Sequence, residues 1–439
     1  MSKIALVFPG QCSHHVGMGN ALCEESNAAK DAFDEASDIL GYDMRKLCRQ
    51  GSLSELNKME IMFPAILTAG VASYRAMCEQ LNAEAVFLAG HSLGEYTALV
   101  CSGAVRFSHM LGVVRKRGQL AQKIADNGTG LISIIDGVPS EQVQLLCDQA
   151  VQEGRTVSIS AYNSQSQVAI CGICEDVEFI ENELIKAKAT ITPLFFSPPF
   201  HSSLMLEIVD ELKETLGSIE YRAFSIPVIA NTNAKPYPSE KVIAEYLCQQ
   251  IVKPVQWKAT LDFFAQTQVD KIFDMGPQAI LANLVKQYNP AISVYSFAQR
   301  EERAALKRAI PLKWHDSGSG KRSVYTIVTR CMAMAVSTRN ANDNDEEYQK
   351  GVIYPYEQLE ALQSDIEQSG SAPTEEQVRK ALAHLHIIFQ TKYLPANEQI
   401  RRYEVLLSGQ DADEGRLVRE FLNEMYAEQM ISSGNGHND

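Results

Sequence analysis

The sequence predicts an α/β protein whose main part is a parallel sheet covered by helices. The first 127 residues alternate short apolar runs with helix-like patterns, as parallel strands joined by helices do. A serine between small residues follows one of these runs directly, and the alternation resumes after residue 197. We therefore expect residues 1–127 and 197–305 to form one large subdomain.

The elements of this subdomain follow from its apolar patterns. Strands are expected at the short apolar runs, residues 3–8, 85–89, 227–230 and 271–275. Helices are expected where apolar residues recur at helical spacing, residues 65–77, 93–101, 108–124, 238–250, 256–266 and 279–287. Gly276 and Pro277 turn the chain between the last strand and the last helix.

A different order of elements between residues 128 and 196 predicts a smaller, inserted subdomain. Strands are expected at residues 131–135, 157–162, 168–171 and 191–196, and helices at 140–152 and 175–188. This βαββαβ order is the ferredoxin-like arrangement. Cys171 and Cys174 form a CxxC there, but no second pair accompanies them, so we expect no metal site.

The segment 306–439 is expected to be an acidic, mostly helical extension. Linkers or exposed loops are expected at 317–322 and 340–347. Thr374 and Gln377 form a capping box, and behind it come Val378, Leu382, Leu385 and Phe389 at helical spacing. A later helix is expected from about Asp413, with Leu417, Phe421 and Met425 on one stripe.

The net charge is concentrated in this extension. Residues 340–439 hold 8 Lys and Arg against 19 Asp and Glu, a balance of −11, out of −14 for the whole chain. A docking module, a lid over the core or a partly disordered tail would each fit. We favour packing on the rest of the chain or contact with a partner module, because the negative charge of the extension would repel partner proteins that are themselves acidic.

Composition excludes several function classes. An acidic chain argues against nucleic-acid binding, and no uninterrupted apolar stretch reaches the roughly 18–20 residues that span a membrane. Ten scattered cysteines fit a reducing compartment, so we expect a cytoplasmic protein without disulfides.

Residues 90–95, Gly-His-Ser-Leu-Gly-Glu, carry the clearest chemical signal. They lie between an expected strand and an expected helix, which is the nucleophile-elbow arrangement of hydrolase-like α/β folds. Gly90 and Gly94 leave room where a side chain would clash. Ser92 needs a base to become a nucleophile, and among nine histidines His201 is the best candidate, because Pro198 and Pro199 stiffen its approach.

These residues resemble the malonyl-CoA:acyl carrier protein transacylases and the acyltransferase domains of polyketide synthases. The matching motifs are Phe8–Gln11 with Gly17–Gly19, Gly90–Glu95, Arg117-Gly118 with Gln122, Pro199–Ser202, Asn231 with Pro236-Tyr237, Gln250 with Pro254–Trp257, and Asp274–Pro277. They occur in the family's order over about 300 residues, and residues after about 305 lie outside the resemblance.

The resemblance implies a Ser–His mechanism. Ser92 would be the acylated nucleophile and His201 its general base and then acid. Gln11 and the backbone N–H of Leu93 would form the oxyanion hole. Gln250 would orient His201, and no carboxylate in the matched motifs stands as a third catalytic residue.

The resemblance also assigns the acyl pocket. Arg117 would hold the malonyl carboxylate and select it over acetyl, because a guanidinium binds a carboxylate bidentately. Phe200 would crowd a branch at the α-carbon, which favours an unbranched acyl group. Phe63 replaces a usual glutamine, and Cys12 a usual glycine, both near the expected pocket. An unusual unit such as hydroxymalonyl or aminomalonyl therefore remains an alternative.

The resemblance implies a free-standing enzyme that loads malonyl-type units onto acyl carrier proteins in trans, for polyketide or fatty acid biosynthesis. Malonyl-CoA would be the substrate, and the acceptor would be the carrier's phosphopantetheine thiol. No tightly bound cofactor or metal is implied. Contact with synthase modules through the extension, a proofreading acyl hydrolase and a non-enzymatic scaffold are the other hypotheses.

Overall fold

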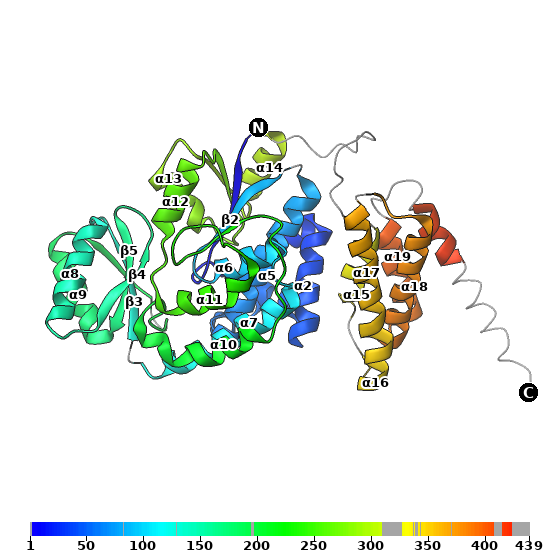
Figure 1. Ribbon diagram of the computed structural model, residues 1–439, viewed down its shortest axis with the longest axis horizontal. Helices are drawn as coiled ribbons and strands as arrows, with labels where there is room; N and C mark the ends of the chain where they lie inside the picture. Colours follow the sequence, from blue (N-terminus) through cyan, green and yellow to red (C-terminus); the bar gives the residue numbers. More distant parts are fainter. Residues whose placement is uncertain are drawn as a thin grey trace, which may run out of the picture. The chain divides into compact units, whose positions relative to one another are not determined.

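The computed structural model describes residues 2–81, 83–128, 130–194, 197–309, 327–336, 338, 341–342, 344–369, 371–407 and 415–423. The chain divides into two compact units, Met1–Trp314 and His315–Asp439, which we describe separately (Figure 1).

A parallel sheet forms the centre of the first unit. Its strand order is β7 (Val228–Ile229), β2 (Ala85–Gly90), β1 (Ile4–Phe8), β8 (Lys271–Asp274) and β9 (Ser293–Ser296). Every neighbouring pair is parallel. Helices cover it, as Figure 1 shows, which confirms the expected α/β class. The edge strand β9 was not predicted.

The helices of the large subdomain are α1 (Asn20–Glu25), α2 (Asn27–Leu40), α3 (Met44–Gln50), α4 (Leu53–Leu56), α5 (Met59–Gln80), α6 (Gly94–Cys101), α7 (Phe107–Asp126), α10 (Val209–Gly217), α11 (Ile243–Val252), α12 (Trp257–Gln266), α13 (Ile280–Tyr288) and α14 (Arg300–Ala309). Helices α5, α6, α7, α11, α12 and α13 overlap the ranges expected from the sequence, whereas α1–α4, α10 and α14 were not predicted. Among the described residues, α5 alone has the length and apolarity of a membrane-crossing helix. However, 78% of its most apolar window is buried, so its place in the protein core accounts for that composition.

The inserted subdomain has the predicted ferredoxin-like topology. Its elements are β3 (Gly130–Asp136), α8 (Ser140–Gln152), β4 (Val157–Tyr162), β5 (Gln167–Ile173), α9 (Cys174–Lys186) and β6 (Thr190–Pro193). The sheet order is β4-β5-β3-β6, and every pair is antiparallel. Strand β6 ends at Pro193 rather than at 196, and residues 195 and 196 lie outside the described residues.

Strand β4 ties this subdomain to the large one. The Tyr162 N–H donates to Val255 O at 2.9 Å, and the Val255 N–H donates to Ser160 O at 2.9 Å. The Ser160 hydroxyl also donates to Phe200 O at 3.1 Å. The backbone just before His201 is therefore held by the small subdomain as well as by the large one.

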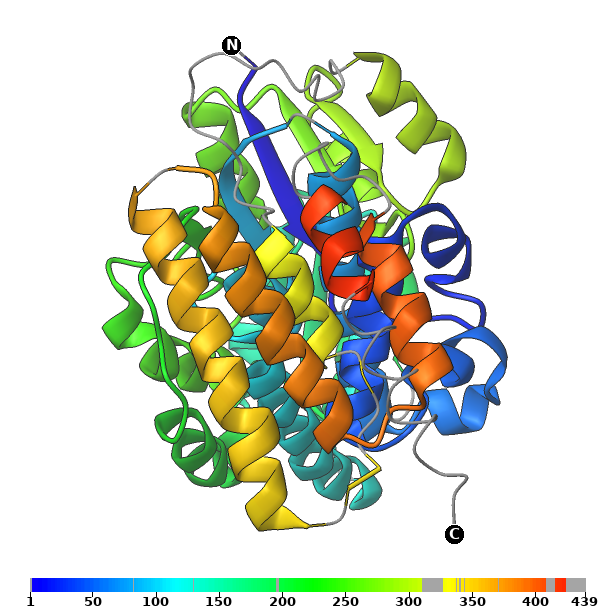
Figure 2. The same ribbon diagram turned by 90° about the vertical axis from the view of Figure 1, so that its right-hand side faces the viewer.

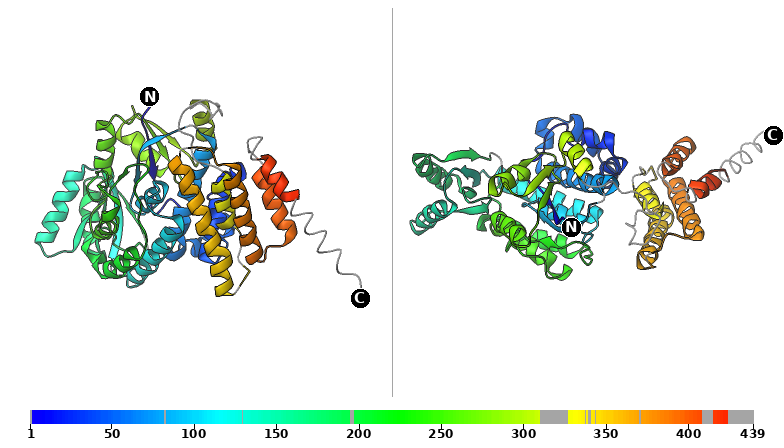
Figure 3. Two further views of the ribbon diagram at one scale, coloured as in Figure 1. Left: turned by 45° about the vertical axis from the view of Figure 1, so that its right-hand side comes forward. Right: turned by 90° about the horizontal axis from the view of Figure 1, so that it is seen from above.

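The second unit is a set of helices with its own apolar core. These are α15 (Ile327–Val336), α16 (Asp345–Tyr348), a π-helical turn η3 (Gln349–Ile353), α17 (Tyr354–Ser369), α18 (Glu375–Thr391), α19 (Ala396–Leu407) and a short helix at 415–423. Helices α15, α17 and α18 pack on one another, as Figures 2 and 3 also show.

The helices of this unit agree with some of the sequence expectations and correct another. The expected loop at 340–347 was partly wrong, because α16 already begins at Asp345. The apolar stripe behind the capping box is buried in the core, and Leu417 is buried too. The expected linker at 317–322, the helix start at Asp413 and Met425 lie outside the described residues.

The capping box at the start of α18 gives a testable expectation. The Thr374 hydroxyl accepts from the Gln377 N–H, and the Gln377 side chain accepts from the Thr374 N–H. Thr374→Ala should cost about 1 kcal/mol of local stability. Hydrogen–deuterium exchange of α18 amides should accelerate roughly fivefold. The matched variant Ser371→Ala, in the loop before the box, should leave these rates unchanged; equal rates in both variants would contradict the expectation.

Candidate active site

A tight turn between β2 and α6 presents Ser92. Its backbone has a φ of 53°, a strained left-handed conformation of the kind that clusters at functional sites. A Cβ on Gly90 would lie 1.8 Å from Gly94 C, and one on Gly94 would lie 1.8 Å from Phe8 O. The two glycines are therefore required for strand β1, strand β2 and helix α6 to meet, as the motif predicts.

The structure brings His201 and Gln250 to this serine. His201 Nε2 lies 2.7 Å from Ser92 Oγ, and His201 Nδ1 lies 2.6 Å from the Gln250 carbonyl oxygen. The carbonyl accepts only, so Nδ1 carries the proton and Nε2 is free to accept from the serine hydroxyl. Residues 92, 201 and 250 come from three distant segments, and here they form one hydrogen-bonded chain.

The electrostatics of the site keep the histidine neutral. Burial and, after it, the nearby charge of Arg117 lower the pKa of His201 to about 3. A neutral imidazole is the form that takes a proton. The Gln250 carbonyl orients the His201 ring by accepting its Nδ1–H, and it does so without adding a negative charge.

The start of α6 offers a donor beside the serine. The Ser92 N–H donates to Asn231 Oδ1 at 2.7 Å, whereas the Leu93 N–H donates to no group in the described part of the chain. A Cβ on Gly10 would lie 3.2 Å from Leu93 N, so the backbone just before Gln11 runs beside the start of α6. A free N–H at a helix N-terminus is suited to a developing negative charge.

Arg117 on α7 lies among aromatic rings and is only 1% exposed. Its guanidinium carbon is 4.4 Å from the Phe200 ring centroid, and 5.1 Å from those of Phe63 and Tyr96. Its Nε and Nη1 atoms are buried without a hydrogen-bond partner. Burial lowers the pKa of Arg117, with Tyr96 and Glu95 opposing. A buried cation with two unused donors is prepared for an anionic ligand.

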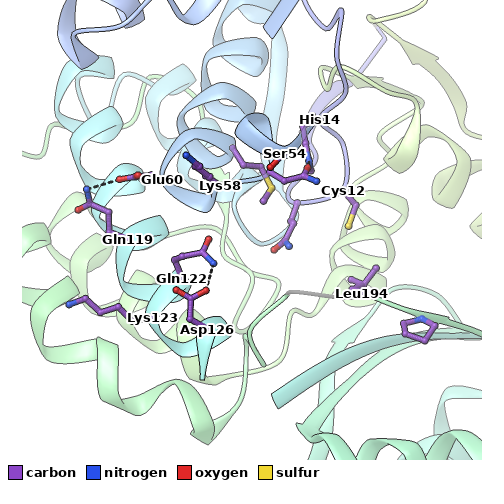
Figure 4. A pocket seen from close by; sticks show the side chains of 14 residues that line it. Cys12, His14, Ser54, Lys58, Glu60, Gln119, Gln122, Lys123, Asp126 and Leu194 are labelled. Atoms are coloured by element: carbon purple, nitrogen blue, oxygen red, sulfur yellow. Dashed lines mark hydrogen bonds between the residues drawn. The ribbon is translucent and has the colours of Figure 1, made fainter. Parts of the chain in front are cut away.

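A cavity of about 1000 Å³ is lined by Gln11, which follows Gly10 beside the elbow. Figure 4 shows side chains from α5, α7 and the loop after β1 around it. It is lined by Gln11, Cys12, His14, Ser54, Asn57, Lys58, Glu60, Met62, Gln119, Gln122, Lys123, Asp126, Pro193 and Leu194. Of the two unusual residues, Cys12 lines this cavity, whereas Phe63 faces Arg117 instead. Among the described residues, no group of three or more potential metal ligands occurs.

Sequence reasoning assigned no role to Glu95, Asn231 or Tyr237. All three are buried behind the elbow, where Glu95 accepts hydrogen bonds from the Asn231 N–H and the Tyr237 hydroxyl. Each belongs to one of the motifs quoted above. That membership was the available signal, but only the fold shows that they meet.

Three comparisons place the chain among known proteins. A family model described as "Acyl transferase domain" matches residues 5–306. A malonyl CoA-acyl carrier protein transacylase of Bacillus subtilis is 30% identical over 405 residues, 91% of this chain and 99% of the relative. A solved structure of the type II polyketide synthase acyl carrier protein AntF with its malonyl-transacylase matches 70% of this chain and 100% of that chain, with 35% identity and a TM-score of 0.67.

The similarity to one relative extends beyond the first unit. The Bacillus subtilis alignment is longer than the 314 residues of the first unit, so it continues into the C-terminal unit. The family model, in contrast, ends at residue 306. The resemblance was expected to end near residue 305, and this relative extends it.

Proposed function

This chain belongs to the acyl transferase domain family as a malonyl-CoA:acyl carrier protein transacylase, and we propose that Ser92 carries the malonyl group between the two thiols. The observation that supports this assignment is the 2.7 Å contact of Ser92 Oγ with a neutral His201, whose proton-bearing nitrogen is held by Gln250.

In the first half-reaction, Ser92 Oγ attacks the thioester carbonyl while His201 Nε2 takes its proton. The carbonyl oxygen becomes negative and is stabilised by the Leu93 N–H together with Gln11. The C–S bond then breaks, and His201 returns the proton to the departing thiolate of coenzyme A. A malonyl ester on Ser92 remains.

The second half-reaction reverses these steps with a different thiol. His201 takes the proton of a carrier phosphopantetheine thiol, whose sulfur attacks the Ser92 ester. The C–O bond breaks, and the proton goes back to Ser92 Oγ. The cavity that begins at Gln11 would hold the pantetheine arm in both half-reactions.

The pocket around Arg117 would select the acyl group. A malonyl carboxylate would pair with the unused Nε and Nη1 donors. Phe63 and Phe200, whose ring centroids are 6.1 Å apart, flank the same guanidinium. A hydroxyl or amino group on the α-carbon would meet these apolar rings without a partner, so malonyl is favoured over hydroxymalonyl and aminomalonyl.

We assign the enzyme to polyketide assembly, where it would load separate carrier proteins in trans. The solved relative bound to a type II polyketide synthase carrier supports this context. Fatty acid biosynthesis uses the same chemistry and is the alternative.

The test is incubation with malonyl-CoA without any carrier. Intact-protein mass spectrometry should find a lasting malonyl adduct, and peptide mapping should place it on Ser92. Rapid release of free malonate with no adduct would instead indicate an acyl hydrolase. Addition of malonyl-CoA and a panel of carrier proteins would then identify the acceptor.

A further inference from the structure

Glu95 is a buried carboxylate that the mechanism above does not use. It lies in the first turn of α6, three residues after the nucleophile, and is 1% exposed. Its Oε1 accepts from the Tyr237 hydroxyl at 2.6 Å and from the Asn231 N–H at 3.2 Å. Its Oε2 accepts from Gln250 Nε2 at 2.6 Å. Three donors point at this side chain, which is the environment of an ionised carboxylate.

Two of these partners hold the reacting groups themselves. Asn231 Oδ1 accepts the Ser92 N–H at 2.7 Å, and its Nδ2 donates to Gly90 O at 2.5 Å. Gln250 holds His201 through its carbonyl, and its Nε2 also donates to Ser92 O at 2.8 Å. Glu95 therefore joins the support of the nucleophile to the support of the base.

We propose that Glu95 is a positioning residue: its ionised carboxylate fixes Asn231 and Gln250, and through them keeps His201 Nε2 against the Ser92 hydroxyl. The proposal rests on the assigned Ser–His chemistry and adds a regulator of it. Glu95 need not touch substrate to act, because a small misalignment of the reacting groups alone lowers the rate.

Protonation of Glu95 would disturb this arrangement. The new proton would need an acceptor, but the Asn231 N–H and Gln250 Nε2 only donate, and the Tyr237 hydroxyl could accept only by giving up its own donation to Glu95. Gln250 Oε1 is buried and has no partner, so turning the Gln250 amide over would supply the acceptor. That rotation would replace the Nε2 donor at Ser92 O by Gln250 Oε1, so that two oxygens would face each other with no hydrogen between them.

The charges around Glu95 place this change near neutral pH. Burial raises its pKa to about 7, while Tyr237, Gln250 and the cation of Arg117 oppose the rise. Tyr96 and Tyr237 face the same region and stay neutral, because burial raises the pKa of both hydroxyls above their usual value. Because burial and Arg117 lower the pKa of His201 to about 3, an acid limb of the rate near pH 7 would come from Glu95.

The test is the pH dependence of Ser92 acylation, measured as coenzyme A release in a single turnover with malonyl-CoA. In the wild-type chain the rate should fall as pH drops through about 7. Glu95→Gln has an NH₂ where the protonated acid has its proton, so it should fix the low-pH state. We expect a rate about 10- to 100-fold lower at high pH, no limb near pH 7, and little change in KM.

Asp31→Asn is the matched control. Burial also raises the pKa of Asp31, to about 6, but this residue lies on α2, outside the network. The variant should keep the limb near pH 7. A limb lost in Asp31→Asn, or retained in Glu95→Gln, would overturn the proposal.

Tyr237→Phe tests the proposal even if Glu95→Gln does not fold. The hydroxyl of Tyr237 lowers the pKa of Glu95, so its loss should move the limb to higher pH. An unmoved limb would overturn the proposal. Failure of the proposed function is distinguishable, because the wild-type chain would then form no malonyl adduct on Ser92 at any pH.

Discussion

Ser92→Ala should abolish malonyl transfer, with a loss of at least about 10⁴-fold in the rate of carrier loading. The substitution removes the only atom on which the ester can form in the proposed mechanism. His201 keeps its hydrogen bond to the Gln250 carbonyl, so the imidazole should stay in place without a hydroxyl to activate. The measurement is carrier loading from malonyl-CoA, followed by mass spectrometry of the carrier.

Ser102→Ala is a suitable control for this experiment. Ser102 is buried at the end of the same helix, and its hydroxyl donates to Leu99 O at 2.8 Å. Its loss should affect stability slightly and leave the transfer rate near that of the wild type. Equal carrier loading by wild type and Ser92→Ala would mean that the chain acts as a scaffold rather than through this serine.

The sequence predicted the elements that have a local cause. Strand β2, the tight turn at Ser92 and helix α6 follow one another, and their periodicities and glycines are all visible within residues 85–101. The inserted subdomain could be predicted too, because its βαββαβ order of elements, visible in the sequence, is typical of the ferredoxin-like fold. Strand β9 was missed because it is short, lies at the sheet edge and has only two apolar residues, both half-buried, so it carries little pattern.

The candidate site was predictable as far as its motifs reached. Ser92, His201, Gln250 and Arg117 were named from motifs, and the fold brings the first three together in hydrogen bonds. The role of Glu95 was not predictable in this way. Its partners lie 136 to 155 residues away in the chain, and nothing local indicates that they meet.

The surroundings of Arg117 were also invisible in the sequence. Phe63 could be recognised as an unusual residue, but not as a ring 5.1 Å from this guanidinium. Two donors of the Arg117 side chain have no partner because the groups packed around them offer no acceptor, and the sequence alone does not show which groups those are. The sequence therefore named the residue expected to bind the carboxylate, whereas the rings around Arg117 and its two unused donors became visible only in the fold.

Arg117→Ala should convert a malonyl-selective enzyme into one that prefers uncharged acyl groups. A charge-assisted pair contributes about 1.5–3 kcal/mol, so malonyl transfer should fall by about one to two powers of ten. Transfer from acetyl-CoA makes no such pair and should fall less or rise, because the substitution enlarges the apolar space between Phe63 and Phe200. The measurement is the ratio of kcat/KM for malonyl-CoA and acetyl-CoA.

Arg117→Lys separates charge from geometry in this prediction. Lysine keeps a cation but loses the planar fork, so it should recover only part of the malonyl preference. Because Arg117 lowers the pKa of Glu95, the alanine variant should also move the acid limb of acylation to higher pH, whereas lysine should largely restore it. An unchanged malonyl-to-acetyl ratio in both variants would show that the carboxylate is bound elsewhere, even though this guanidinium has unused donors.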